Sequence, residues 1–242
     1  MPLRPFAIER YFASYEMVVP HLFSSSDCES LSLERLLTLA DEETLELWKR
    51  LRLGYTDSQG LATLRDAIAR LYRNVSPDDV VVVVPEEGIL LAMHAVLKAG
   101  DHVITTFPAY QSLYEIARDI GCEVDHWTPN EQQGWHFDPA DLERLARPTT
   151  RLLVINFPHN PTGYLPPHGE FQRIVAWAQQ RNIRIFSDEM YRLLEFDRAD
   201  RLPSAVDCDD RAMVLSGMSK SFGLSGLRVG WLPHAIVPSS IE

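Results

Sequence analysis

The chain has 242 residues, of which 45% are hydrophobic, and its formal net charge is −11. A chain of this length and composition can bury a large core in one or two domains, and its acidic balance argues against nucleic acid or an anionic membrane as a partner. The three cysteines lie far apart and match neither a disulfide framework nor a zinc-binding spacing, so we expect no metal and a reducing, cytoplasmic location.

Missing motifs narrow the function classes further. No apolar stretch approaches the ~20 residues of a membrane helix, so we expect neither a membrane-spanning protein nor one secreted by a standard signal. The sequence has no Gly-x-Gly-x-x-Gly and no phosphate-loop Gly-Lys-Ser/Thr. Dinucleotide-binding and nucleotide-triphosphate-binding functions therefore lose their main support.

The N-terminal part is expected to contain an arm and one helix. Residues up to about Leu31 are expected to form an extended polar arm. Residues 33–51 follow a helical pattern, and Leu36, Leu45 and Trp48 belong to its apolar face.

From Gly60 onward, helical and strand-like patterns alternate. Helices are expected at residues 61–72, 88–98, 111–120 and 171–180, with a further helix start at Asp138-Pro139; strands are expected at residues 80–84, 102–106, 123–127, 152–155, 183–187, 212–215 and 227–232. Such alternation predicts an α/β fold with a mostly parallel sheet. The strands are rich in Val, Ile and Leu, as in a sheet covered on both faces, which favours a three-layer α/β/α arrangement.

The most informative residue is Lys220, which follows the expected strand 212–215 in a run of small and hydroxyl residues. Sheets of this class bind ligands beyond the carboxyl ends of their strands, so the amine can point into a cleft. A desolvated lysine near a second cation such as Arg228 has a lowered pKa and can form a Schiff base with a carbonyl. Alone, such a lysine is more often a solvated turn residue, so the interpretation depends on its companions.

Three further strand ends carry suitable side chains. Asp188 closes strand 183–187, and a buried carboxylate needs a strong partner such as a protonated ring nitrogen, a helix terminus or an ion pair. Asn160 lies in a rigid turn with two prolines and a glycine, where it can donate to a phenolate oxygen or serve an ordinary turn. Tyr110 follows strand 102–106 and can stack on a planar ring or pack in the core. With Lys220, these groups suit a pyridine aldehyde phosphate.

On these residues the sequence resembles the class I/II aminotransferases, which are fold-type I enzymes dependent on pyridoxal phosphate (PLP). The resemblance covers nearly the whole chain. Its specific motifs are Asn160-Pro161-Thr162-Gly163, Asp188 with Tyr191, and Ser219-Lys220 with Gly226 and Arg228; weaker ones are Pro108 with Tyr110, and Tyr55 with Gly60, Leu64 and Arg65. The resemblance implies transfer of an amino group between an amino acid and a 2-oxo acid.

The resemblance also implies a role for each residue around the ring. Lys220 would form the Schiff base and shuttle the proton, and Asp188 would pair with the pyridine nitrogen. Asn160 and Tyr191 would donate to the ring oxygen, while Tyr110 would stack on the ring.

Further residues would hold the phosphate. By the same resemblance, Arg228 and a serine near Lys220, Ser219 or Ser216, would bind the phosphate. Tyr55 would reach the phosphate of the other subunit, which implies a homodimer with shared sites.

One segment departs from the family pattern. Glu86 and Glu87 stand where relatives usually have a glycine and small or hydroxyl residues that cradle the phosphate. Pro85 suits a first helical turn, whose free N–H groups favour an anion. Because two carboxylates would repel a phosphate, we expect both side chains to point away and only the backbone N–H groups to contribute.

The expected domains are an N-terminal arm with a small-domain or dimer-contact segment (1–55), a PLP-binding large domain (56–233) and a linker toward a missing C-terminal small domain (234–242).

No residue here matches the family arginine that pairs with the substrate carboxylate. Another PLP enzyme, such as a lyase, decarboxylase or synthase, stays open, as does a truncated PLP-binding pseudoenzyme. The Asn160-Pro161 peptide bond is expected to be cis.

Overall fold

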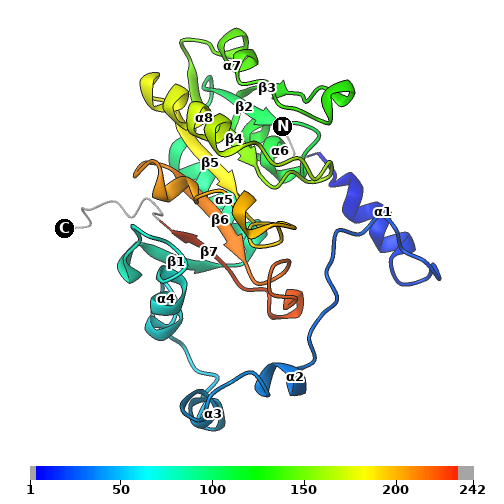
Figure 1. The fold of residues 1–242 in the computed structure, drawn as a ribbon, viewed down its shortest axis with the longest axis vertical. Coiled ribbons are helices and arrows are strands. Elements are labelled where there is room, and N and C mark those ends of the chain that lie inside the picture. The colour runs from blue at the N-terminus through cyan, green and yellow to red at the C-terminus, as the bar shows by residue number, and fades with distance from the viewer. Residues whose placement is uncertain (1–3, 234–242) are drawn as a thin grey trace.

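The computed structural model describes residues 4–233, and a seven-stranded sheet lies at its centre (Figure 1). The expected linker at residues 234–242 lies outside the described residues. The strands are β1 (Val80–Val83), β2 (His102–Thr106), β3 (Glu123–Trp127), β4 (Thr150–Asn156), β5 (Arg184–Asp188), β6 (Met213–Gly217) and β7 (Gly230–Pro233). The helices are α1 (Ala7–Tyr15), α2 (Leu33–Leu37), α3 (Glu42–Lys49), α4 (Ala62–Ala69), α5 (Pro85–Val96), α6 (Ser112–Ile120), α7 (Ala140–Leu145) and α8 (His168–Gln180). Short 3-10 helices include Ala205–Asp207 and Ser225–Leu227.

The sheet is mostly parallel, as predicted. Its strand order is β1-β7-β6-β5-β4-β2-β3, and β7 runs antiparallel to both of its neighbours. In the register of the central strands, Asn156 at the end of β4 lies beside Asp188 at the end of β5, which lies beside Leu215 of β6. The segments that follow these three strands therefore emerge next to one another at the carboxyl edge.

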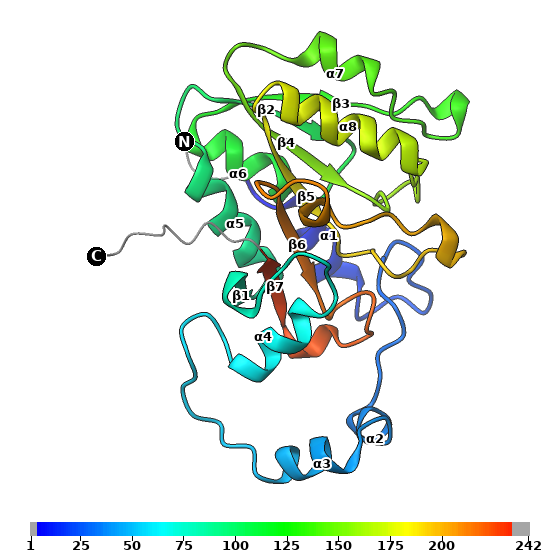
Figure 2. The ribbon, with the colours of Figure 1, turned by 60° about the vertical axis from the view of Figure 1, so that its left-hand side comes forward.

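Helices cover both faces of the sheet (Figure 2), which confirms the three-layer arrangement. Successive side chains of a strand point to opposite faces. On β4, Leu153 and Ile155 pack in the same apolar cluster as Ile174 of α8, whereas Leu152 and Val154 pack in the cluster that contains helices α5 and α6. A run of consecutive apolar residues is thus needed to fill both layers.

The N-terminal segment differs from the sequence-based expectation. The arm is not fully extended, because α1 has apolar side chains at Ile8, Tyr11 and Tyr15, a helical spacing. The expected single helix over 33–51 is wrong. Asp41 accepts a hydrogen bond from the backbone N–H of Thr44 and so begins a new helix, α3, after α2 has ended.

Two glycines allow close contacts near the carboxyl edge. A Cβ at Gly88 would lie 2.8 Å from Leu215 Cδ1, so α5 packs directly on β6. Gly223 has a φ of +63°, and a Cβ there would lie 2.9 Å from the carbonyl oxygen of Glu29. The Gly223 carbonyl accepts a hydrogen bond from the Leu31 N–H at 3.0 Å, which joins the N-terminal segment to the loop after β6.

Element boundaries shift by a few residues elsewhere. Helix α5 begins at Pro85 rather than at residue 88, with Val84 as its N-cap residue. Residues 225–227 form a 3-10 turn, so β7 begins only at Gly230. None of the helices within residues 4–233 has the length and apolar character needed to cross a bilayer.

The layered core predicts where truncation is costly. Ile174→Ala should lower the free energy of unfolding by about 2–5 kcal/mol, because Ile174 is fully buried between α8 and the sheet. Leu39→Ala, at a side chain that is 64% exposed, should change it by less than about 0.5 kcal/mol. Urea denaturation followed by circular dichroism measures both, and equal effects would contradict the packing described here.

Candidate active site

A cavity of about 760 Å³ lies at the carboxyl edge of the parallel strands. Its walls come from the segments after β4, β5 and β6, from the start of α5, and from α1 together with residues 24–27. The sequence-predicted residues that line it are Lys220, Asp188, Asn160, Tyr191, Tyr110, Arg228, Ser219 and Glu86. Most of the candidate residues thus meet in one place.

Lys220 lies just beyond β6, and an acidic residue contacts its amine. Lys220 Nζ forms a hydrogen-bonded ion pair with the carboxylate of Asp27, from the N-terminal segment. The hydrogen bond from Lys220 lowers the pKa of Asp27, and burial only partly opposes this effect. The charged group that contacts the amine is therefore an anion, Asp27, and not the cation Arg228 that the sequence suggested.

Asp188 ends β5 with its carboxylate buried at the cavity wall. The side chain accepts a hydrogen bond from the Met190 N–H at 3.1 Å. Burial raises the pKa of Asp188 to about 6; the Met190 bond and the charge of Lys220 oppose this rise, and Glu86 adds to it. Within residues 4–233, no Lys, Arg or His nitrogen forms an ion pair with this carboxylate at 4.0 Å or less. The site thus contains a buried acid that forms no ion pair with the residues described.

The turn after β4 and the turn after β5 are hydrogen-bonded to each other. Asn160 Nδ2 donates to the Tyr191 hydroxyl at 3.0 Å, and this hydroxyl donates to Ser26 Oγ at 2.8 Å. Asn156, which is buried, accepts from the Asn160 N–H at 2.8 Å and donates to the Asp188 carbonyl at 3.0 Å. Burial raises the pKa of Tyr191 to about 12. The peptide bond after Asn160 is cis, as predicted.

Tyr110 forms part of the wall nearest to α1. Its hydroxyl donates to Glu9 at 3.3 Å, and its ring meets Phe6 edge-on with a centroid distance of 4.8 Å. Burial, followed by the negative charges of Glu86 and Glu9, raises the pKa of Tyr110. The phenol is therefore held protonated beside two carboxylates.

The expectation for Glu86 is wrong, because its side chain does not point away from the site. Glu86 lines the cavity, and its carboxylate accepts a hydrogen bond from the Ser112 hydroxyl of α6. Residue 86 is in the first turn of α5, which faces α6, and this places the carboxylate beside Tyr110. Glu87 lines a separate cavity of about 250 Å³ and not the main one.

The groups expected to hold a phosphate are only partly assembled. The first intrahelical bond of α5 runs from the Gly88 N–H to Val84, so the preceding N–H groups of the first turn remain available for an anion. Ser219 and Arg228 line the cavity. Ser216 does not, because side chains alternate along β6 and its hydroxyl is directed to Tyr72 on the other side of the strand. The expectation that Ser216 lines the site is wrong.

Tyr55 lies outside the cavity and its side chain is fully exposed. Its predicted contact with a second subunit stays a prediction. Within the described residues, no group of three or more His, Cys, Asp or Glu side chains is arranged to hold a metal ion.

Sequence reasoning missed several residues of the site. Ser26, Asp27 and Glu9 belong to the N-terminal segment, and Asn156 is the last residue of β4. The helical spacing in α1 and the cluster Ser24-Ser25-Ser26-Asp27 were visible signals, but neither indicates which distant residue it meets. Lys220 and Asp27 are 193 positions apart in the chain.

Known aminotransferases are similar to this chain in sequence. The valine–pyruvate aminotransferase of Mycobacterium tuberculosis is 35% identical over 198 residues, which are 79% of this chain and 50% of that protein. The glutamate–pyruvate aminotransferase of Escherichia coli K12 is 33% identical over 187 residues, 74% of this chain and 46% of that protein. The chain thus spans about half the length of the curated relatives it matches.

Solved structures agree. A PLP-dependent aminotransferase from Streptococcus suis 89-1591 superposes with a TM-score of 0.88 at 30% identity, covering 98% of this chain and 63% of that chain. The aspartate aminotransferase from Thermus thermophilus has a TM-score of 0.72 at 26% identity, covering 79% and 52%. The family model for aminotransferase class I and II matches residues 22–233. The chain therefore belongs to the class I and II aminotransferase family.

Proposed function

We propose that this chain forms the cofactor-binding part of a PLP-dependent aminotransferase, which transfers an amino group between an amino acid and a 2-oxo acid. One observation supports this most strongly: the buried Asp188 carboxylate, which lacks a cationic partner among the described residues, lines the same cavity as the Lys220 amine. A buried charge of this kind is costly unless a cation approaches it. A protonated pyridine nitrogen is such a cation.

The donor set fits PLP at both ends. The carboxylate of Asp188 would hold the ring nitrogen in its protonated form by opposite charge. The first-turn N–H groups of α5, with Ser219 and Arg228, would hold the phosphate dianion. When bound, PLP supplies an electron sink for the pair of electrons left when an amino acid loses its Cα proton.

The residues around the ring would orient it and move a proton. Lys220 would hold the cofactor covalently through Nζ, and the same Nζ, when free, would take up and return the proton. Asp27 forms an ion pair with this nitrogen. Asn160 and Tyr191 would direct hydrogen-bond donors at the ring oxygen, and Tyr110 would fix the ring plane by stacking.

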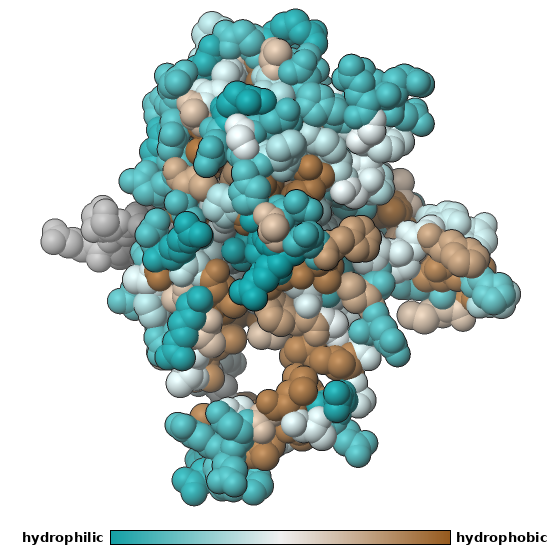
Figure 3. Space-filling view, viewed as in Figure 1, coloured by the Kyte–Doolittle hydropathy of each residue, from teal (hydrophilic) through white to brown (hydrophobic). Residues whose placement is uncertain are grey.

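We also propose a homodimer with shared sites. Tyr55 is fully exposed on the N-terminal segment, where it can reach a second subunit. Helices α1, α2 and α3 bury no residue, and Figure 3 shows apolar side chains on their surface. Trp48 and Leu47 are among these exposed side chains. Such a surface favours burial against a partner.

The finer proposals concern organisation and location. We place the dimer-contact segment at residues 1–55 and the PLP-binding domain at 56–233, because the layered sheet begins after the N-terminal helices. The three cysteines are free thiols, which supports a reducing, cytoplasmic location.

Trapping the cofactor tests the proposed function. PLP mixed with the chain should produce a new absorbance band, and borohydride should lock the cofactor onto the peptide that contains Lys220. Lys220→Ala should abolish both signals, whereas Lys49→Ala, at an exposed lysine paired with Glu46, should retain them. Mass spectrometry identifies the labelled peptide, and label on another lysine in the variant would contradict the assignment.

Transfer itself is tested in a single turnover. Valine, glutamate and aspartate, the amino acids named in relatives, would be mixed with the PLP-loaded chain. Conversion of the bound aldehyde to the amine form, with release of the 2-oxo acid, is the expected result. Unchanged cofactor with every amino acid, despite bound PLP, would instead indicate a binding protein.

Replacing Glu86 tests the proposed cofactor site in a second way. Glu86→Gln should tighten PLP binding by about three- to tenfold, because a partly screened repulsion between two anions is of the order of 1 kcal/mol. Glu87→Gln is the matched control and should leave the affinity unchanged, since Glu87 lies outside the main cavity. Fluorescence titration measures both, and weaker binding of Glu86→Gln would show that the carboxylate assists the cofactor.

The pKa of Asp188 predicts a pH-dependent stability of the free chain. The folded-state pKa of about 6 exceeds the ordinary value of 3.8, so ionisation of Asp188 costs the folded state stability that is lost progressively as the pH rises from about 4 to about 6 and is fully lost above that. Asp188→Asn should therefore stabilise the free chain at about pH 7.5, and this gain should shrink as the pH falls toward about 4.5. Urea unfolding at both pH values measures the difference, and a gain independent of pH would refute the shifted pKa.

A further inference from the structure

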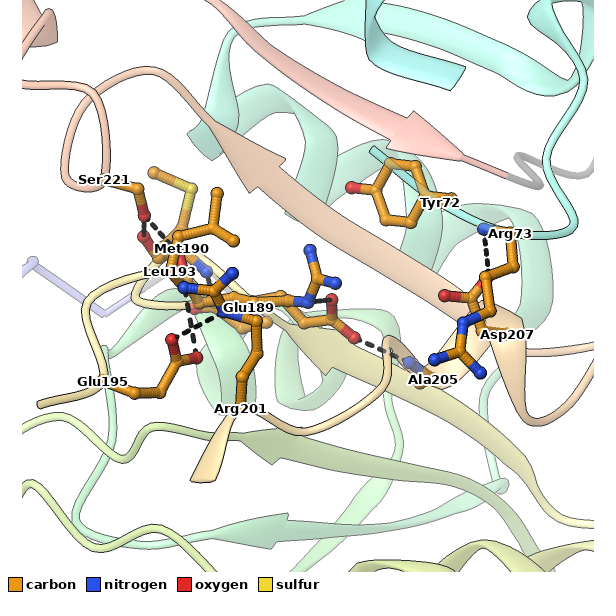
Figure 4. A network of polar contacts seen from close by, with 12 residues as sticks. Tyr72, Arg73, Glu189, Met190, Leu193, Glu195, Arg201, Ala205, Asp207 and Ser221 are labelled. Atoms are coloured by element: carbon orange, nitrogen blue, oxygen red, sulfur yellow. Dashed lines mark hydrogen bonds and ion pairs between the residues drawn. The ribbon is translucent and has the colours of Figure 1, made fainter. Parts of the chain in front are cut away.

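A second buried acid, Glu189, follows Asp188 directly but lies outside the cavity. Its exposed fraction is 3%, and it does not line the main cavity. Its side chain extends instead toward the 3-10 turn Ala205–Asp207, as Figure 4 shows. None of the proposed steps on the cofactor uses this carboxylate, so its burial needs another explanation.

Glu189 is bonded through both its side chain and its backbone. Its carboxylate accepts from the Ala205 N–H at 2.8 Å and lies 3.9 Å from Arg192 Nε. Its own N–H donates to the Leu215 carbonyl of β6 at 2.8 Å, and its carbonyl accepts from the Arg192 N–H at 3.1 Å. Burial raises the pKa of Glu189 to about 7, although the Ala205 bond and the charge of Arg192 oppose this rise. These contacts hold the start of the turn 189–192 against the sheet.

The other end of this turn is held by the residue next to Lys220. The Ser221 hydroxyl lies within hydrogen-bonding distance of two carbonyl oxygens, Met190 O at 3.2 Å and Arg192 O. Figure 4 shows Ser221 on the side of the turn away from Ala205. The turn 189–192 is thus bonded to the sheet at Glu189 and to the loop of Lys220 through Ser221. Tyr191 of this turn lines the cavity.

We propose that Glu189 is a positioning residue that, with Ser221, sets the placement of Asp188 relative to Lys220. The proposal rests on the proposed function, because these two groups would hold opposite ends of one pyridine ring system. Loss of the Glu189 carboxylate would leave the Ala205 N–H buried without its acceptor and would remove the acid that faces the Arg192 guanidinium. The turn would then relax, and a displacement of about 1 Å between reacting groups can cost about 100-fold in rate.

If Glu189 and Arg192 formed an ion pair with a purely structural role, the experimental result would differ. Removing the pair would lower the stability of the fold but leave the position of Asp188 relative to Lys220 unchanged. Two ligands separate these roles: PLP can bond to Lys220 through its aldehyde, whereas pyridoxamine phosphate has the same ring and phosphate but no aldehyde. The ratio of their affinities therefore reports how well Lys220 meets the aldehyde carbon.

The experiment measures this ratio on the 242-residue chain by fluorescence titration, well below each melting temperature. Glu189→Ala should reduce the preference for PLP over pyridoxamine phosphate by about tenfold or more. Glu189→Gln keeps an acceptor for the Ala205 N–H and should stay within about threefold of the wild type. Glu195→Ala is the matched control: the Glu195 side chain is equally buried and pairs with Arg201 at 3.0 Å, but its backbone partner is the Leu193 N–H, just beyond the turn, and not a group of the turn itself. It should lower the melting temperature without changing the ratio.

Each outcome of this experiment either supports or overturns the proposal. An unchanged ratio in folded Glu189→Ala overturns the proposal and leaves a structural ion pair. If Glu189→Ala does not fold, Ser221→Ala becomes the deciding variant, because it removes only the opposite anchor; a lowered ratio supports the proposal and an unchanged one overturns it. If the wild type itself shows no bond between PLP and Lys220, the proposed function fails and this inference fails with it. A normal wild-type bond with unchanged variants overturns the inference alone.

Discussion

The burial of one carboxylate at the edge of a parallel sheet is the constraint on which the site depends. Asp188 is held there by strand register, with the end of β4 on one side and β6 on the other. Its charge is desolvated, and its hydrogen bond to Met190 satisfies only part of its capacity. The fold therefore holds a carboxylate without an ion-pair partner at the wall of a cavity. A protonated ring nitrogen bound there would supply the positive charge.

The N-terminal segment completes the cavity while packing loosely. It supplies Ser26, Asp27 and Glu9, yet α1 to α3 contain no buried residue. It contacts the sheet domain through hydrogen bonds and an ion pair, among them those to Tyr110, Gly223 and Lys220. A segment that buries so little apolar surface gains little of its stability from the core, so the lysine and its acidic partner belong to parts of the fold that are stabilised in different ways.

Behind the cavity, buried polar groups give the turn after β5 two anchors. Glu189 fastens its start, and Ser221 bonds its far end to the loop of Lys220. Asn156 likewise bonds both to the turn of Asn160 and to the carbonyl of Asp188. Buried hydrogen bonds of this kind limit the arrangements that the side chains can adopt, which is what a site built from several strand ends requires.

The sequence by itself determined most of the strands, the mostly parallel character of their sheet and the strand ends where Lys220, Asp188, Asn160 and Tyr110 stand. Such features follow from local periodicity and from the rule that carboxyl ends of parallel strands meet at one edge. Only the tertiary structure decided which partners these residues have. Asp27 contacts an amine 193 positions away, and Glu86 faces the cavity because α5 starts at Pro85 against α6. Contacts between distant segments depend on how whole elements pack, and no local pattern records that packing.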